Sequence, residues 1–550
     1  MRSSNTWFVA AFIRAAFVLA MLTGGSAIAV AQKSGEKSGE KSGEKSGGTL
    51  RIYHRDTTPS ASIHEETTIS TVIPFMGVYN NLVMFKQDVP RNSLESIVPD
   101  LAESWSWNAD LTAVTFKLHQ GVKWHDGQPM TARDVKCTWD MIADRSGEGK
   151  LRKNPRKEWY HNLAEVRVDG EHTVTFQLGR PQLSFMALLA SGFSPVYPCH
   201  VPAAQMRTKP IGTGPFKVVE LNPSITIKLA RNTAYFKQGR PYLDGIEWKV
   251  MQNRATAMLA FRADEIDLTF PAEVSMAILK DIRSQSPASV CQVRPTNVST
   301  NLIINHGVPP FNNRELVKAV MLGFDRKAYN DILYQGEATV GGAMLPAPEG
   351  VWGMPPGYLD DVPGYSGTAE ENRQKARAIM RQLGYGPDNM LKVKLTVRNI
   401  ALYRDPAVVM QGQLREIWID AEMDLVETPQ YAPRMARRDY VITAGMVGSG
   451  LDDPDQQFYE NYSCGSPRNL GQFCDKEVDR LVDQQSRETD LEKRRKLVWE
   501  IDRKLQREGV RPILSHYRAA TCWHPRVKGL TVMENSIYNG WRFEDIWLDR

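Results

Sequence analysis

The sequence predicts an α/β protein with more than one hydrophobic core, and three observations lead to that class. Segments with apolar residues at every second position alternate with segments of helical periodicity in both halves of the chain. The chain has 550 residues, whereas a single core usually stops growing at about 250–300 residues. No repeat of roughly 20–50 residues stands out in the sequence. We therefore expect helices layered on largely parallel sheets.

The N-terminal segment, residues 1–31, has the features of a secretory signal peptide. Arg2 and Arg14 supply positive charge, residues 15–22 form a short apolar core, and residues 29–31 (Ala-Val-Ala) form a small-residue cleavage site. The apolar run is shorter than the ~20 residues that a spanning helix needs. We expect no membrane span in the mature protein.

Residues 32–47 consist mainly of repeated Lys-Ser-Gly-Glu units. They offer no apolar surface to bury and their charges alternate in sign, so we expect a disordered tether that acts only as a spacer. No cysteine precedes Cys137, which excludes a lipid-modified N-terminal cysteine. We expect a freely soluble periplasmic protein of a Gram-negative cell.

The composition and motif inventory exclude several classes of function. The formal charge is +5, or +3 without Arg2 and Arg14, and no basic stripe with interleaved aromatic residues suggests nucleic acid. Hydrolase, metalloprotease, phosphate-loop and dinucleotide motifs are missing, and residues 448–450 (Gly-Ser-Gly) lack the frame of a nucleophile elbow. The ten histidines are scattered, so no histidine metal cage is expected. We expect no catalysis, no metal and no cofactor.

The first half of the chain predicts a series of short elements. Residues 48–53 form the first strand, and residues 65–85 contain the first helix. Val114, Phe116 and Leu118 alternate with polar residues, as in a half-buried strand. Thr131 and Asp134 have the spacing of a capping box that opens a helix through Trp139. Further strands are expected at residues 217–220, 225–229 and 246–251, with a helix at residues 255–263.

The second half continues the alternation of strands and helices. Asn312 and Glu315 are predicted to cap a helix over residues 314–328, and Thr368 and Glu371 to cap another that ends at Gly384. The remaining expected elements are strands at residues 300–305 and 391–397, a helix at 405–417, and a long helical stretch after Asp475 with a new capping box at Thr489 and Glu492.

His125 and Asp126 are neighbours and could be mistaken for a catalytic dyad. Adjacent residues in a strand or turn point their side chains apart, so neither orients the other for catalysis. Asp126-Gly127 is instead a turn dipeptide between the strand and the helix described above. We interpret this segment as structural.

Four segments together carry a family resemblance. They are residues 79–83 (YNNLV), 124–135 (WHDGQPMTARDV), 212–216 (GTGPF), where the glycines and proline predict a sharp turn, and 264–267 (DEID). Their order resembles the extracytoplasmic solute-binding proteins of ABC importers, in the large family 5 that includes oligopeptide-, dipeptide- and nickel-binding proteins.

The resemblance implies a fold similar to the type II periplasmic binding proteins. Two lobes would be assembled from three discontinuous domains, with a ligand cleft between domains I and III. Domain I would comprise residues 48–80, 209–298 and 518–550, domain II residues 81–208, and domain III residues 299–517.

It also implies a function in transport. A monomeric protein would capture a peptide or peptide-like solute by closure of the cleft and deliver it to an inner-membrane permease. Receptors for an opine, a sugar-like solute or a nickel chelate are the alternatives, together with a secreted enzyme on the same fold.

The same resemblance suggests ligand-binding residues in three segments. In residues 64–69, Glu66, Thr67 and Thr68 would meet the ligand. In residues 397–404, Arg398 is the nearest match to an arginine that holds the peptide carboxylate in dipeptide-binding relatives, and Tyr403 lies near it. A guanidinium suits that task because its planar fork donates two hydrogen bonds to a carboxylate.

The third segment, residues 444–458, contributes Met446, Gly450 and Asp452. Dipeptide-binding relatives have a tryptophan-glycine-aspartate pattern here, whose aspartate clamps the α-ammonium group of the ligand. Gly450 occupies the matching position in this sequence, so the clamp is missing unless Asp452 replaces it. This departure argues against a free dipeptide.

The six cysteines do not make a disulfide-dense scaffold. Cys464 and Cys474 are the expected disulfide, since they flank a short loop rich in turn residues and members of the resembled family often carry a disulfide hairpin there. The other four cysteines are expected to be buried thiols, with a bond between Cys291 and Cys522 as the alternative.

Overall fold

The computed structural model describes residues 43, 45–146 and 150–550. The predicted signal peptide and most of the predicted tether lie outside the described residues. The described residues 45–146 and 150–550 form one compact unit. Within the described ranges, no helix combines the length and the apolar character that crossing a membrane requires.

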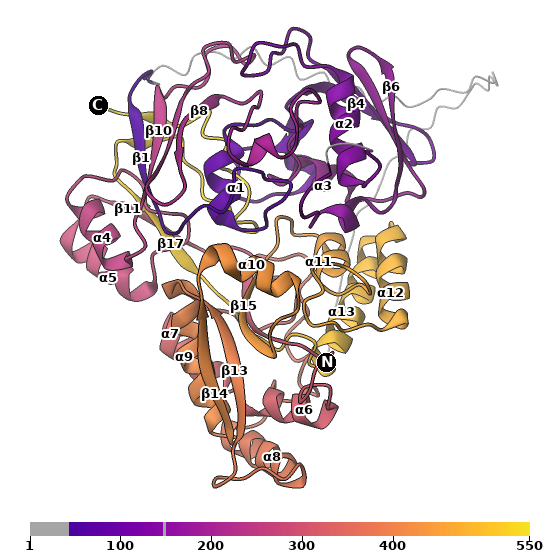
Figure 1. Ribbon diagram of the computed structural model, residues 1–550, viewed down its shortest axis with the longest axis vertical. Coiled ribbons are helices and arrows are strands. Elements are labelled where there is room, and N and C mark those ends of the chain that lie inside the picture. The colour runs from indigo at the N-terminus through magenta and orange to yellow at the C-terminus, as the bar shows by residue number, and fades with distance from the viewer. Residues whose placement is uncertain (1–42, 44, 147–149) are drawn as a thin grey trace, which may run out of the picture. The chain divides into compact units, whose positions relative to one another are not determined.

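The first sheet joins strands from distant parts of the chain. Its order is β1 (Thr49–His54), β10 (Gly245–Val250), β9 (Thr226–Arg231) and β8 (Phe216–Asn222). β1 runs parallel to β10, and the other two pairings are antiparallel. Figure 1 shows α1 (Ile69–Met76) near this sheet, with α4 (Arg254–Arg262) and α5 (Met276–Gln285) at its lower end.

The second sheet is entirely antiparallel, in the order β4 (Ala102–Trp107), β5 (Ala113–Leu118), β7 (Thr173–Leu178) and β6 (Leu163–Gly170). The predicted alternation of β5 is confirmed, because Val114, Phe116 and Leu118 are buried. α2 (Ala132–Ile142) packs on β6 and β7, and α3 (Phe185–Ala190) follows. The predicted capping box is confirmed, since the Thr131 backbone N–H donates to Asp134 Oδ2 at 2.9 Å.

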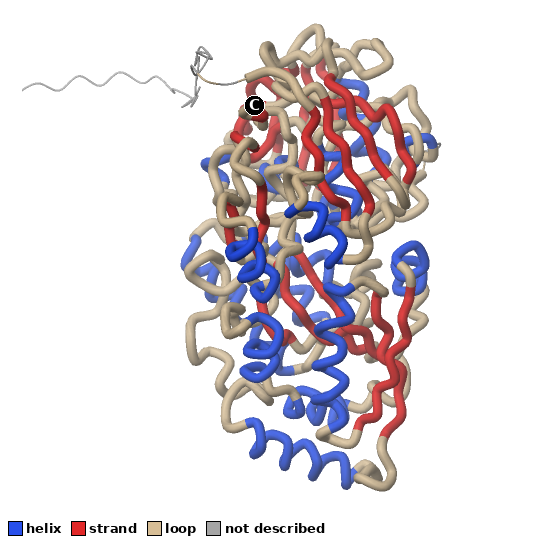
Figure 2. Tube along the Cα trace, turned by 90° about the vertical axis from the view of Figure 1, so that its left-hand side faces the viewer, coloured by secondary structure: helices blue, strands red, loops and turns tan. Residues whose placement is uncertain are grey.

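The third sheet has five strands, in the order β14 (Ile419–Val426), β13 (Leu391–Arg398), β15 (Ile442–Gly448), β12 (Val298–Ile304) and β16 (Ile513–His516). Figure 2 shows these strands in the lower part of the view, with helices packed beside them. The helices of this region are α6 (Arg314–Gly323), α7 (Arg326–Tyr334), α8 (Ala369–Gln382), α9 (Ala401–Arg415), α10 (Thr428–Ala436), α11 (Pro454–Asn461), α12 (Lys476–Arg487) and α13 (Leu491–Arg507).

Three pairs of short strands complete the described part of the chain. They are β2 (Val83–Phe85) with β3 (Ile97–Pro99), β18 (Val527–Lys528) with β19 (Trp547–Leu548), and β11 (Val290–Arg294) with β17 (Ala519–Trp523). The prediction of largely parallel sheets was wrong. Among the described strands, parallel pairing is confined to β1 with β10 and to β13 with β14 and β15. The short links within β4–β5, β6–β7 and β8–β9 explain this, because a tight turn can join only antiparallel neighbours.

Several predicted helix ends need correction. The helix expected over residues 314–328 divides into α6 and α7, because Asp325 accepts a hydrogen bond from the Ala328 backbone N–H at 2.9 Å and starts a new helix. The cap of α6 is Asn313 rather than Asn312, and that of α13 is Asp490 rather than Thr489. α9 begins at Ala401, ahead of the predicted residue 405.

Other predicted ends are correct. The capping box of Thr368 and Glu371 at the start of α8 is confirmed. At the far end of the same helix, Gly384 adopts a positive φ of 87°, as expected for a residue that ends a helix.

The chain bends at residues 213–215, as predicted, and the glycines of residues 212–216 also permit close backbone contact. Neither Gly212 nor Gly214 has a positive φ. A Cβ on Gly212 would lie 1.9 Å from the Val78 carbonyl oxygen, and a Cβ on Gly214 would lie 2.5 Å from the Val78 carbonyl carbon. The Gly214 backbone N–H donates to that same oxygen at 2.9 Å. The sequence segment therefore joins the start of β8 to the chain after α1.

All six cysteines form disulfides: Cys464 with Cys474, Cys137 with Cys199, and Cys291 with Cys522. The prediction of four buried thiols was wrong. The Cys199 backbone N–H donates to Asp134 of α2 at 2.9 Å, which brings its loop against Cys137. Cys291 and Cys522 lie directly opposite each other on β11 and β17.

In the described chain, two crossings lead to and from the five-stranded sheet. β11 continues through residues 295–297 into β12, and β16 continues through residues 517–518 into β17. β11 pairs with β17, and β12 pairs with β16, so the crossings run side by side. We call β11, β12, β16 and β17 with their links the crossing ribbon. It separates a first lobe (residues 45–294 and 519–550) from a second lobe (residues 298–516), while the predicted three-domain boundaries stay a prediction.

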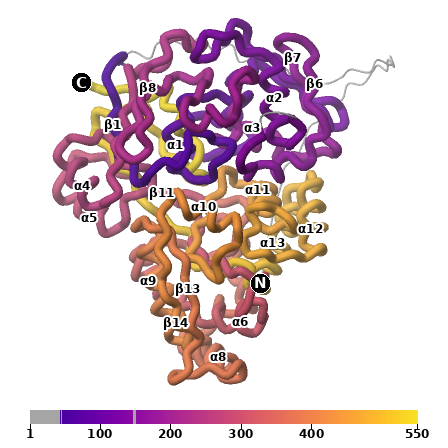
Figure 3. The backbone as a smooth tube through the Cα atoms, in the orientation of Figure 1, coloured from indigo at the N-terminus to yellow at the C-terminus, as the bar shows by residue number. Residues whose placement is uncertain are grey.

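The last residues of the predicted tether contact the first lobe. Lys45 Nζ lies 2.5 Å from Asp549 Oδ1, and the Gly47 backbone N–H donates to the Tyr242 carbonyl at 2.8 Å. Figure 3 shows the yellow C-terminal chain beside the indigo strand β1, where these contacts occur. The tether prediction was therefore wrong for residues 45–47, which find partners that a local sequence pattern does not reveal.

Candidate functional site

A cavity of about 810 Å³ lies between the two lobes. The first lobe contributes the loop before α1, around residues 65–69, and the segment of residues 152–155. The second lobe contributes the end of β13, the helix α10 and residues 445–448 of β15. The loops of one lobe and the sheet of the other therefore enclose the same space.

The structure brings together six of the eight residues that we predicted to bind ligand. Glu66, Thr67, Thr68, Arg398, Tyr403 and Met446 all line the cavity. They come from three segments that are far apart in the sequence. Ligand contact by these residues stays a prediction.

Gly450 and Asp452 do not line the cavity. The Gly450 carbonyl accepts hydrogen bonds from Ser536 Oγ at 3.0 Å and Asn539 Nδ2 at 2.9 Å. Asp452 Oδ2 accepts a hydrogen bond from the Val351 backbone N–H at 3.1 Å, and burial raises the Asp452 pKa to about 7. The structure thus uses Asp452 to hold a neighbouring loop, and it does not replace the missing amine clamp.

Arg398 reaches the cavity, but its guanidinium already has a counterion. It forms a buried ion pair with Asp56, and its Nε donates to Thr428 Oγ1 at 2.9 Å. Thr428 also donates to Asp56 Oδ2 at 2.9 Å. Asp56 belongs to the first lobe and Arg398 to the second, so this ion pair connects the lobes at the edge of the cavity.

Glu65 and Glu66 also have cationic partners. Arg207 donates two hydrogen bonds to Glu65, at 2.7 and 2.8 Å. Glu66 lies 3.3 Å from Arg152 and 3.7 Å from Lys153. Burial raises the pKa of Glu66, although both cations oppose that rise. Neither carboxylate is therefore available as an unpaired counterion for a cationic ligand.

Strand β15 presents an unpaired backbone edge to the cavity. It pairs with β12 along its full length, from Ile442 to Gly448. On its other side, the described pairing with β13 ends at Thr443. The cavity lining includes Gly445, Met446, Val447 and Gly448. This edge can therefore offer backbone N–H and C=O groups to an extended ligand.

Aromatic side chains add flat apolar surface to the same space. Tyr403, Tyr431, Tyr517 and Tyr538 line the cavity, and the rings of Tyr403 and Tyr431 have centroids 6.2 Å apart. Rigid aromatic walls with a few polar groups are typical of small-molecule sites.

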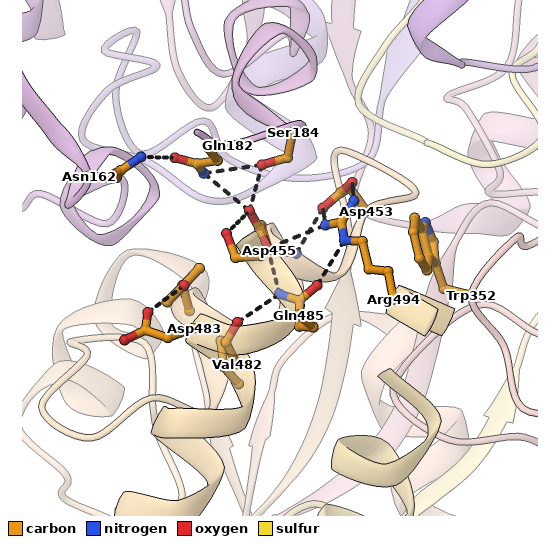
Figure 4. A network of polar contacts seen from close by, with 12 residues as sticks. Asn162, Gln182, Ser184, Trp352, Asp453, Asp455, Val482, Asp483, Gln485 and Arg494 are labelled. Carbon is orange, nitrogen blue, oxygen red and sulfur yellow. Dashed lines mark hydrogen bonds and ion pairs between the residues drawn. The ribbon is translucent and has the colours of Figure 1, made fainter. Parts of the chain in front are cut away.

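A buried polar network also connects the lobes (Figure 4). Asp455 of α11 accepts hydrogen bonds from Ser184 Oγ at 2.6 Å and Gln182 Nε2 at 3.2 Å, both in the first lobe. Within the second lobe it accepts from Gln485 Nε2 at 2.6 Å and Ser486 Oγ at 2.8 Å.

Arg494 supplies the counter-charge for this network. It lies 2.9 Å from Asp453 and 3.4 Å from Asp455, and its guanidinium stacks on the Trp352 ring at 4.6 Å. Interactions with Arg494 and with the surrounding hydrogen-bond donors outweigh burial and lower the Asp455 pKa. The Asp455 carboxylate, which accepts hydrogen bonds from both lobes, is therefore ionised at neutral pH.

Sequence reasoning missed a group of charged residues at another part of the cavity. Arg468 and Arg511 line it, and Glu460 pairs with Arg468 at 2.9 Å. Glu460 lies near the end of α11, Arg468 in the turn-rich segment after it and Arg511 just before β16. No local pattern marks these residues as a site. Their proximity depends on the tertiary fold alone.

Within the described residues, no group of three or more histidine, cysteine, aspartate or glutamate side chains is arranged to hold a metal ion.

Comparisons with known proteins agree with this architecture. The family described as "Bacterial extracellular solute-binding proteins, family 5 Middle" matches residues 96–469. The chain is 23% identical over 467 residues to the "Probable di/tripeptide-binding protein 5" of Pseudomonas aeruginosa, covering 80% of this chain and 85% of that protein.

Solved structures show the same fold. The periplasmic binding protein DppA from Helicobacter pylori, in complex with the peptide STSA, matches with a TM-score of 0.80 at 22% identity, over 92% of this chain and 99% of that one. The binding protein AgaA from A. tumefacien R10, in complex with agropinic acid, matches with a TM-score of 0.77 at 22% identity, over the same shares of both chains. The two-lobed α/β fold is thus shared with proteins that hold small solutes.

Proposed function

Because this chain belongs to the bacterial extracellular solute-binding proteins of family 5, we propose that it captures a peptide or peptide-like solute in the cavity between its lobes. It acts as a monomer in the periplasm, after removal of the signal peptide and without a lipid anchor. It then delivers the solute to the permease of an ABC importer. The proteins to which it is similar are binding proteins, and we propose that this chain likewise performs no catalysis.

The open edge of β15 is the observation that carries this proposal. An extended peptide can add to such an edge as a further strand, because its backbone N–H and C=O groups match those of the sheet. Binding through the backbone gives affinity for many sequences and leaves selectivity to the surrounding side chains. The curated relative named as a di/tripeptide-binding protein supports the same ligand class.

The crossing ribbon supports capture by closure. In the part of the chain that the structure describes, two crossings join the lobes, and their links at residues 295–297 and 517–518 are short, which is the arrangement of a hinge. Thr296 and Asn297 in the first link both have positive φ angles, of 28° and 51°. The Asp56–Arg398 pair and the Asp455 network would form as the lobes close and separate as they open.

Native mass spectrometry of protein purified from the periplasm without denaturation tests this function. We expect adducts of variable, peptide-like mass that disappear after the protein is stripped in guanidinium chloride and refolded with its disulfides intact. A single discrete small mass would instead identify one specific solute and overturn the peptide assignment. A spectrum without adducts, together with no thermal shift across a peptide library, would overturn the receptor function.

A further inference from the structure

Basic side chains outnumber carboxylates in the cavity. Seven arginine and lysine side chains line it, against two carboxylates, Glu65 and Glu66. Both carboxylates already pair with cations. Carboxylates that do not line the cavity neutralise three of the basic groups. Asp56 pairs with Arg398, Glu273 with Arg55, and Glu460 with Arg468. The lining thus keeps an excess of positive charge.

Arg511 is the buried part of that excess. The residue is only 1% exposed. Its Nη2 donates to the Arg468 carbonyl at 2.8 Å and its Nη1 to Asn461 Oδ1 at 3.2 Å, while its Nε has no hydrogen-bond partner. Among the ion pairs of the described residues, none includes Arg511. Burial lowers the Arg511 pKa, and the positive charge of Arg468 lowers it further.

A second buried guanidinium faces the same charges from the first lobe. Arg156 is also 1% exposed. It donates to the Glu66 carbonyl at 2.8 Å, and its Nε and Nη1 have no hydrogen-bond partner. It stacks on the Phe193 ring at 3.8 Å and forms no ion pair with any described carboxylate. Burial lowers its pKa to about 10, with Glu460 opposing and Arg468 adding to the shift.

Glu460 is the one carboxylate that these three arginines share in the described part of the chain. It accepts a hydrogen bond from Arg468 Nε at 2.9 Å and another from Trp159 Nε1 at 2.7 Å. We call Arg156, Arg468 and Arg511 the arginine cluster. Three guanidinium groups with one counterion leave two positive charges without a carboxylate, and two of the three groups, Arg156 and Arg511, are buried.

We propose that the part of the cavity lined by Arg468 and Arg511 is an anion subsite, and that the captured solute carries an acidic group there. This inference rests on the proposed function and specifies its substrate class. A buried cation without a counterion is unfavourable, so an oxyanion that enters regains the lost attraction. Guanidinium groups also suit this task because they donate charge-assisted hydrogen bonds in a planar fork.

The position of the cluster couples the acidic group to closure. Arg156 belongs to the first lobe, whereas Arg468 and Arg511 belong to the second. Arg156 does not itself line the cavity. Closing the lobes nevertheless brings these like charges together, and an anion at the subsite of Arg468 and Arg511 offsets that repulsion. An acidic solute therefore favours the closed form more than its neutral counterpart does.

Matched pairs of probes test the subsite. They are tri-alanine and its C-terminal amide, galacturonate and galactose, and glucose 6-phosphate and glucose, each titrated by calorimetry and thermal shift at low and high salt. We expect at least one acidic member to bind at least tenfold more tightly than its neutral partner, with a difference that shrinks in salt. If a carboxylate pair shows this preference, the acidic group is a carboxylate; if the phosphate pair shows it, the acidic group is a phosphate. Equal or absent binding by all the acidic members would overturn the inference.

Two substitutions should change affinity in opposite directions. Arg511→Gln should weaken binding of the preferred acidic probe at least tenfold. Glu460→Gln removes the shared counterion but keeps an oxygen for Trp159, and it should strengthen binding several-fold. Partial unfolding cannot produce both results, because an unfolded variant would lose affinity in both cases.

Arg326→Gln is the matched control. Arg326 is likewise buried, at 5% exposure, donates to the carbonyl groups of Ile513 and Gly364 at 2.8 Å, and does not line the cavity. Its substitution should leave probe affinity unchanged. If Arg511→Gln binds like the wild type, the subsite is refuted, while an adduct in the native mass spectrum would still support the receptor function.

Discussion

Gly212 and Gly214 show how single residues bring distant parts of the backbone into contact. Both lie against Val78, and the Gly214 carbonyl accepts hydrogen bonds from Asn232 Nδ2 and His125 Nε2, each at 3.0 Å. Strand β8, the chain after α1 and the turn before α2 therefore meet at one point. A side chain at either glycine would push these segments apart.

We expect Gly212→Ala to lower the free energy of unfolding by at least ~3 kcal/mol, because a methyl group would overlap the Val78 carbonyl oxygen and backbone cannot move aside as a flexible side chain does. Denaturant titration measures this change. Gly412→Ala in α9 is the control, since a Cβ there meets nothing within 4 Å. That control should be neutral or stabilise by up to ~1 kcal/mol. Equal stabilities of the two variants would contradict the close-contact explanation.

Helix α11 of the second lobe carries polar contacts to the first lobe. Asp453 caps its start, Asp455 lies in its first turn and Glu460 near its end. Asp455 and Glu460 both accept hydrogen bonds from the first lobe, through Ser184 and Trp159. One short helix of the second lobe therefore carries two of the contacts between the lobes.

Ser184→Ala should weaken solute binding about fivefold, because the closed form loses one hydrogen bond worth about 1 kcal/mol. Ser486→Ala provides the comparison, since Ser486 donates to the same Asp455 oxygen at 2.8 Å but from within the second lobe. It should lower stability and leave affinity almost unchanged. Calorimetric titration of both variants with the same ligand decides the matter, and equal losses of affinity would rule out a role in closure.

The elements differ in how well the sequence predicts them. Local sequence patterns predicted a helix start correctly where the residues of one segment alone form the cap, as in the capping boxes at Thr131 and Thr368. They failed by one residue at Asn312 and Thr489, where a neighbouring asparagine or aspartate competes for the same backbone N–H groups.

The candidate site was less accessible to sequence reasoning. The resemblance located six residues that line the cavity, but it gave no sign that Asp56 neutralises Arg398. The arginine cluster and the Cys137–Cys199 bond join residues that only the folded chain brings together. Such contacts have no signature in any one segment.

At the scale of the molecule, the crossing ribbon joins both lobes with very little chain. The Cys291–Cys522 disulfide fixes its β11–β17 end. Isolated bridges connect β17 to Leu268, and Leu268 to Ile52 of β1, so this end belongs structurally to the first sheet. The other end, β12 and β16, is part of the five-stranded sheet. We therefore expect any bending between the lobes to occur at the links between them.

The double substitution Cys291→Ser with Cys522→Ser should lower the free energy of unfolding by about 4–5 kcal/mol. The bond closes a loop of 231 residues, and a bond that closes a longer loop removes more conformational entropy from the unfolded chain. Cys464→Ser with Cys474→Ser opens a loop of only 10 residues and should cost about 2–3 kcal/mol. Equilibrium unfolding in denaturant compares the two. A larger loss for the short loop would contradict this ranking.

The connectivity of the disulfides also constrains how the chain is oxidised. If cysteines paired in the order in which they emerge during synthesis, Cys291 would join Cys464, and Cys474 would join Cys522. The native pairing forms directly only if Cys291 stays reduced while Cys464 and Cys474 are synthesised, until Cys522 follows near the C-terminus. Correct assembly thus depends on slow oxidation or on a disulfide isomerase that repairs the early mispairing.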